Sequence, residues 1–186
     1  LHKEYRRQRQ MCIRDSLGTG NQPKAVVDSG LKLAHIAKLV RGERYRSELL
    51  NTIMFGAYNK RIKDNRTAND WLTKDTKIVD EYLSDPKCSY KFTANAYIGF
   101  LNVIKYDIDK KNIAKTPDKL PVLFASGLED PVGDYGKGVK KAFKMYTKYV
   151  DNVELYLYED DRHELHSETD REDIFSDLYE WIEENV

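Results

Sequence analysis

Apolar residues in the first half of the chain recur three or four positions apart, the spacing that places side chains on one face of an α-helix. They fall into four groups: Val27, Leu31 and Ala34; Leu49, Leu50, Ile53 and Met54; Ile78, Val79, Tyr82 and Leu83; and Tyr97, Phe100, Leu101 and Ile104. Asp85-Pro86 ends the third predicted helix, because a residue before proline is pushed out of the α region. Thr93 can cap the fourth. Residues 17–105 are therefore predicted to be helical.

The pattern changes after a charged connector, residues 106–119. Residues 120–125 form a short continuous apolar run, which is typical of a strand buried on both faces. A helical pattern follows, and residues 153–158 predict a second strand. Thr169 and Glu172 have the spacing of a capping box, which predicts the start of a terminal helix.

Strand, helix, strand and helix in this order predict a parallel βαβα unit. Two strands alone cannot bury both faces of a parallel sheet, and the helical region before them supplies no further strand. We therefore predict an α/β fold in which residues 120–186 are the C-terminal part of a larger sheet domain.

The composition fits a soluble globular protein, with 40% hydrophobic and 33% charged residues. No apolar run is long enough to span a bilayer, and no secretory signal is visible. We therefore expect a cytoplasmic protein without a membrane span.

Residues 1–16 carry five basic and two acidic side chains, a pattern that could indicate a nucleic-acid-binding arm. Residues 11–16 suggest another origin. Their sequence, Met-Cys-Ile-Arg-Asp-Ser, back-translates to DNA that resembles the transposon-end adapter of sequencing libraries. We predict that residues 1–16 are not native, and we expect no nucleic-acid partner. Without them Cys88 is the single cysteine, so neither a disulfide nor a cysteine-containing metal site is expected.

Candidate chemistry lies after the two predicted strands, in residues 126–134 and 159–166. Ligands bind at the carboxyl ends of strands in open parallel sheets, so these loops should share one rim. Asp130 in the first loop and His163 in the second can then meet, and a carboxylate beside an imidazole stabilises its protonated form. Glu129 and Asp134 are rival acids, and His166 is a rival base. The ordinary alternatives are a turn aspartate and a solvated loop histidine.

Two motifs carry a family resemblance. Gly127-x-x-Asp130-Pro-Val, with Arg162-His163-Glu164 further on, resembles the ending of the serine aminopeptidase/monoacylglycerol lipase-like α/β-hydrolases, which include bacterial lysophospholipases and esterases. Residues 17–20 resemble the strand end that leads into the cap of that family. The segments that resemble the cap itself are Phe55-Gly56-Ala57-Tyr58-Asn59-Lys60, Asp70-Trp71-Leu72 and Asp85-Pro86-x-Cys88.

The resemblance implies a Ser-His-Asp triad in which Asp130 is the acid, His163 is the base and no metal or organic cofactor takes part. The family's nucleophile lies in a Gly-x-Ser-x-Gly motif upstream of the cap, and these 186 residues contain no such motif. Ser29-Gly30 lacks the first glycine, and Ser126-Gly127 lies at the strand end of the acid. The chain is thus expected to be a truncated serine hydrolase.

The implied substrates are carboxylic esters, lipid-like esters or amides, and residues 17–105 would form the cap. Four aromatic residues of this region are candidates for an acyl pocket or for the core: Phe55, Trp71, Phe92 and Tyr97. The alternative function is a non-catalytic binding module on a remnant of the fold, since fold does not dictate function. The sequence leaves the oligomeric state open.

Overall fold

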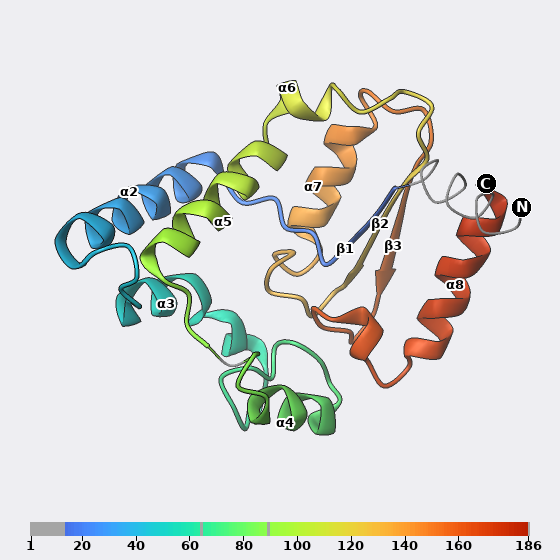
Figure 1. Cartoon of the computed structure of the whole chain (residues 1–186). Coiled ribbons are helices and arrows are strands. Elements are labelled where there is room, and N and C mark those ends of the chain that lie inside the picture. The colour runs from blue at the N-terminus through green and yellow to red at the C-terminus, as the bar shows by residue number, and fades with distance from the viewer. Residues whose placement is uncertain (1–13, 64, 89, 186) are drawn as a thin grey trace, which may run out of the picture.

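A parallel three-stranded sheet lies at the centre of the structure, in the order β1-β2-β3 (Figure 1). The strands are β1 (Arg14–Leu17), β2 (Val122–Gly127) and β3 (Val153–Tyr158). This computed structural model describes residues 14–63, 65–88 and 90–185. The parallel pairing confirms the predicted α/β fold, and β1 adds a third strand to the two that the sequence indicates.

Strand β2 is the middle strand, and all six of its residues are buried, as its continuous apolar run predicts. On one face Val122 and Phe124 pack against α7 (Lys137–Tyr146). On the other face Ala125 packs against α8 (Arg171–Glu184). The helices thus cover opposite faces of the sheet.

The helical region forms a layer beside the sheet (Figure 1). Its elements are α2 (Lys24–Arg41), α3 (Glu48–Phe55), the 3₁₀ helix η1 (Tyr58–Arg61), α4 (Thr76–Ser84) and α5 (Ala94–Asp107). The four predicted apolar groups lie in α2, α3, α4 and α5, and the side chain of Thr93 caps α5 as expected. Helices α2 and α5 pack together through Val27, Leu31 and Leu101. No helix among the described residues is long and apolar enough to cross a membrane.

The connector and the last helix differ from the sequence patterns. Residues 106–119 contain the short helix α6 (Lys110–Ile113), in which Ile113 is buried. The capping box predicted at Thr169 is wrong, because α8 begins at Arg171 and its N-cap residue, Asp170, makes no side-chain capping bond.

Three residues of the segment predicted to be foreign, residues 14–16, lie in β1. Their pairing with β2 uses main-chain groups, which any sequence can supply. The foreign origin of residues 1–16 therefore stays a prediction, and residues 1–13 lie outside the described part of the chain.

The middle strand should dominate the stability of the sheet. Leu123 is completely buried in β2, so Leu123→Ala is expected to lower the free energy of unfolding by about 2–5 kcal/mol. Urea unfolding followed by tryptophan fluorescence measures this loss. Leu39→Ala in α2 is the control, because Leu39 is 86% exposed and its truncation should change stability by less than about 0.5 kcal/mol. Equal losses at the two positions would contradict this description of the core.

Candidate active site

The loop that follows β3 lies close to the end of β2 at Gly127. A Cβ atom at this position would lie 2.1 Å from the carbonyl oxygen of Asp161 and 2.4 Å from that of Arg162. Glycine therefore allows the loop after β3 to lie directly against the end of β2. The main-chain N–H of Glu129 donates to the Asp161 carbonyl at 2.8 Å and holds the two loops together.

Asp130 and His163 meet at this rim. Nδ1 of His163 lies 3.1 Å from Oδ2 of Asp130, and Oδ1 of Asp130 accepts a hydrogen bond from the N–H of Val132 at 2.8 Å. Asp130 is fully buried, whereas the His163 side chain is 27% exposed. Since a carboxylate only accepts hydrogen bonds, Nδ1 carries the proton and Nε2 is left as a base. The pair can therefore take up a proton at Nε2 and stabilise the resulting imidazolium.

The rival groups lie elsewhere. Glu129, Asp134 and His166 are all exposed. Asp134 also has a left-handed backbone with φ of +48°, in the turn that leads into α7. In the described part of the chain, the carboxylate that bonds His163 is that of Asp130.

An aromatic cluster from the helical region covers the pair on one side. The indole of Trp71 lies 5.3 Å from the His163 ring, centre to centre. Trp71 stacks on Phe55 at 6.4 Å and meets the edge of Tyr58 at 4.9 Å. Burial and the negative charge of Asp130 raise the pKa of Tyr58 to about 12. The cluster thus places an apolar surface next to the imidazole, while the His163 side chain stays 27% exposed.

Of the four aromatic candidates, the structure brings Phe55 and Trp71 to the site and places Phe92 and Tyr97 in the core of the helical region. Tyr97 is completely buried, packs against Phe92 at 5.5 Å and donates its hydroxyl to Asn51 at 3.2 Å. No ring contact within the described residues joins Phe92 or Tyr97 to Trp71 or His163.

The sequence reasoning missed two residues of the site. Tyr58 follows Phe55 by three positions, which is the one local signal that the two share a face. Gly18 gives no local signal. It has a left-handed φ of +59°, and a Cβ atom there would lie 2.9 Å from Cε1 and 3.0 Å from Nδ1 of His163.

One group of acidic residues has the composition of a cation site. Oxygen atoms of Asp161, Glu168 and Asp170 lie within 4.8 Å of one another. The ammonium group of Lys74 pairs with Asp161 and lies 3.6 Å from Asp170. Because this internal cation already sits among the carboxylates, the group has the character of an ion-pair cluster.

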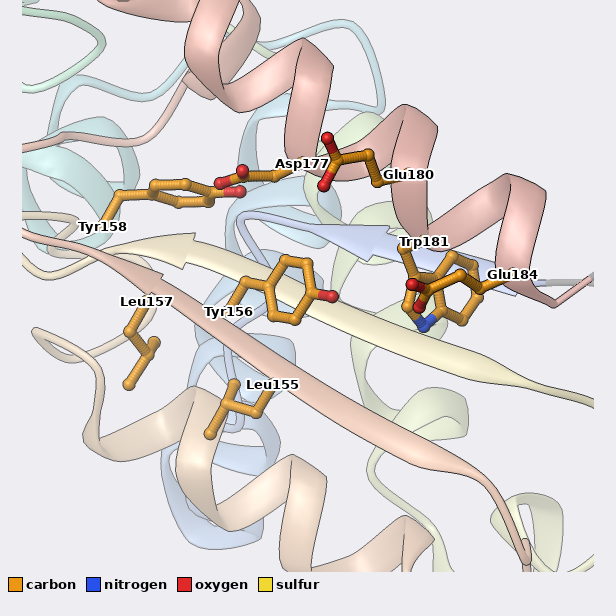
Figure 2. Close-up of a pocket in the computed structure, with 8 residues that line it drawn as sticks. All are labelled: Leu155, Tyr156, Leu157, Tyr158, Asp177, Glu180, Trp181 and Glu184. Atoms are coloured by element: carbon orange, nitrogen blue, oxygen red, sulfur yellow. The ribbon is translucent and has the colours of Figure 1, made fainter.

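A cavity of about 540 Å³ lies between β3 and α8, away from the Asp130–His163 pair. Figure 2 shows Tyr156 and Tyr158 pointing from β3 toward Asp177, Glu180 and Trp181 of α8. Burial, followed by the charge of Asp177, raises the pKa of Tyr158. None of the residues that line this cavity belongs to the loops that carry Asp130 and His163, so the cavity is separate from the candidate site.

The contact between Gly18 and the imidazole gives a sharp prediction. Gly18→Ala should displace the His163 ring, and the ¹⁵N chemical shifts of its two nitrogens should move away from the pattern of a ring protonated at Nδ1. Gly42→Ala is the matched control, because Gly42 also has a left-handed φ, +89°, but a Cβ atom there meets nothing within 4 Å. Both substitutions strain the backbone by about 1–3 kcal/mol. Unchanged His163 signals in Gly18→Ala would contradict the geometry.

A sequence profile described as serine aminopeptidase S33 matches residues 26–170. A search of curated proteins finds no significant match. Among solved structures, a thermostable carboxyl esterase from Bacillus coagulans in complex with glycerol superposes with a TM-score of 0.84 at 22% identity, over 94% of this chain and 57% of that one. A lipase in an open form gives a TM-score of 0.76 at 26% identity, over 91% and 56% of the two chains.

A soluble variant of the monoglyceride lipase from Saccharomyces cerevisiae, in complex with a substrate analog, gives a TM-score of 0.67 at 18% identity. That match covers 97% of this chain and 58% of the lipase. The chain thus spans a little over half the length of these structures. The likenesses show part of an α/β-hydrolase fold, and the profile covers most of the chain. The chain therefore belongs to the serine aminopeptidase S33 family.

Proposed function

We propose that the protein to which this chain belongs is a serine hydrolase that cleaves carboxylic esters or amides through a Ser-His-Asp triad. The observation that carries the proposal is the 3.1 Å contact between the buried Asp130 carboxylate and Nδ1 of His163. It leaves Nε2 free to act as a general base. A partly exposed imidazole that is backed by a buried carboxylate is the arrangement that general-base catalysis needs, and a binding module has no need for it.

In the proposed mechanism, a serine from outside these 186 residues attacks the substrate carbonyl. Nε2 of His163 takes the serine proton, and the tetrahedral intermediate then collapses as the same proton passes to the leaving alcohol or amine. Water repeats the sequence on the acyl-enzyme and frees the acid and the serine. The Asp130 carboxylate holds the imidazole in the Nδ1-protonated tautomer and stabilises the imidazolium.

The aromatic cluster favours a substrate that carries an apolar group. Trp71, Phe55 and Tyr58 present a large ring surface next to His163, where it would contact an acyl chain or an apolar leaving group. The carboxyl esterase and the monoglyceride lipase that share the fold favour an ester over an amide as the cleaved bond. We therefore propose lipid-like esters as the first substrates to test, with the helical region as the cap over them.

The proposal predicts unequal effects for two neighbouring acids. In a form of the protein that includes the upstream serine, Asp130→Asn should lower kcat for a p-nitrophenyl ester by about 10⁴-fold, because an amide neither fixes the tautomer nor stabilises imidazolium. His163→Ala should lower kcat by several orders of magnitude. Asp134→Asn is the control. It lies in the same loop but is exposed, and asparagine tolerates its left-handed backbone, so activity should stay within about twofold.

The opposite ranking, with Asp134→Asn inactive and Asp130→Asn active, would show that the acid of the triad is Asp134 and that the assignment to Asp130 is wrong. Near-normal turnover in His163→Ala would refute the triad and favour the non-catalytic binding module.

A further inference from the structure

The loop that carries His163 is fastened to the helical region. We call residues 159–170 the histidine loop and residues 70–75 the tryptophan segment. The guanidinium of Arg162 donates from Nη1 to the carbonyl oxygens of Asp70 at 2.6 Å and Thr73 at 2.9 Å. One side chain of the histidine loop therefore binds two carbonyls of the tryptophan segment.

Main-chain hydrogen bonds join the same two segments. The N–H of Glu164 donates to the carbonyl of Leu72 at 2.8 Å, and the N–H of His163 points to the carbonyl of Trp71 at 3.4 Å. The main chain of the candidate base thus lies against the residue whose indole packs on its imidazole. A shift of the tryptophan segment would move the backbone of His163 with it.

Glu168 lies at the centre of this contact and is completely buried. Its Oε1 accepts from the N–H of Arg162 at 2.7 Å, on the residue next to His163. Its Oε2 accepts from the N–H of Lys74 at 2.9 Å. The hydroxyl of Thr73 lies 3.0 Å from Oε2 and 2.8 Å from the Ser167 carbonyl, so its one hydrogen is shared by two acceptors of the histidine loop. One carboxylate therefore ties the two segments together, because Oε1 binds the histidine loop and Oε2 binds the tryptophan segment. Burial raises the pKa of Glu168, and these three donors oppose that effect.

Lys74 adds a charged contact beside Glu168. Its ammonium pairs with the buried carboxylate of Asp161 and lies 3.6 Å from Asp170. Burial raises the pKa of Asp161, and the charge of Lys74 opposes that rise. The two segments are thus fastened by main-chain and hydroxyl donors, a guanidinium and an ammonium, and each segment supplies some of the donors.

We propose that Glu168 is a positioning residue, which holds the histidine loop on the tryptophan segment and so sets the alignment of the His163 imidazole on Asp130. The catalytic consequence rests on the proposed hydrolase function, but the alignment does not. A displacement of about 1 Å in a reacting group can cost about 10²-fold in rate, so a loop of this kind needs a rigid support. Glu168 supplies that support without touching the reacting atoms.

The test is Glu168→Gln, which keeps the side-chain volume. Each oxygen of Glu168 accepts from a main-chain N–H, that of Arg162 or that of Lys74, and the amide nitrogen of glutamine only donates. The amide nitrogen must therefore face one of these N–H groups, and that hydrogen bond is lost. The ¹⁵N spectrum of the full chain, with the His163 signals identified by their loss in His163→Ala, reports the tautomer. We expect one Nδ1-protonated ring in the wild type and a mixture of tautomers in Glu168→Gln.

The matched control is Glu164→Gln, which lies next to His163 in the same loop. The Glu164 carboxylate accepts from the Ser167 hydroxyl at 3.1 Å, within the histidine loop. Its replacement should leave the His163 signals as in the wild type. Unchanged His163 signals in a folded Glu168→Gln variant would overturn the proposal, as would equal changes in both variants.

A second variant covers the case in which Glu168→Gln does not fold. Thr73→Val keeps the side-chain shape and removes the hydroxyl that lies 3.0 Å from Oε2 of Glu168 and 2.8 Å from the Ser167 carbonyl, two acceptors of the histidine loop. It should therefore produce a smaller shift of the His163 signals in the same direction. A wild-type pattern in folded Thr73→Val, with Glu168→Gln unfolded, would assign Glu168 to stability alone and overturn the proposal.

Ester hydrolysis by a form that includes the upstream serine separates this proposal from the proposed function. Glu168→Gln should lower kcat by about 10–100-fold with KM nearly unchanged, and Glu164→Gln should match the wild type. An inactive wild type in which Glu168→Gln still changes the tautomer would reject the hydrolase and keep the positioning role. An active wild type with equal kcat in Glu168→Gln would reject the positioning role alone.

Discussion

Asp130 has no access to solvent, and a carboxylate in such a place must be paired if the fold is to tolerate its charge. The Val132 N–H and the His163 imidazole supply that pairing. The hydrogen bond to His163 depends on the close approach of two loops, which Gly127 permits at the end of β2 and Gly18 permits beside the ring. The parallel sheet brings these elements to one rim, and the rest of the site is arranged around this one contact.

The helical region takes part in the site as well as covering it. It approaches the Asp130–His163 pair with the rings of Tyr58 and Trp71 and fastens the histidine loop through Glu168. These contacts join segments about ninety residues apart in the chain. In the role proposed for Glu168, these contacts couple the position of the base to the helical layer.

The elements and the acid–base pair could be predicted from the sequence because their signals are local or topological. Helical spacing identified α2 to α5, and the apolar run identified β2. The rule that ligands bind at the carboxyl ends of parallel strands placed Asp130 and His163 on one rim. The structure shows them in contact there.

The features that could not be predicted depend on contacts between distant segments. Gly18 and Glu168 become significant only once β1 and the tryptophan segment lie beside the histidine loop. The capping-box pattern at Thr169 failed for a related reason, since its neighbours Glu168 and Asp170 face Lys74 and the tryptophan segment. Aromatic identity alone could not separate Trp71, which contacts His163, from Tyr97, which fills the helical core.

We have proposed that Asp130 and His163 are two members of a triad whose serine lies outside these 186 residues. Sequencing native DNA upstream of the Leu17 codon tests it most directly. We expect an in-frame segment that encodes a strand, a Gly-x-Ser-x-Gly motif and a helix in place of the codons for residues 1–16. A native reading frame that keeps those codons and contains no such motif would contradict it, and would make a non-catalytic binding role the better description of the pair.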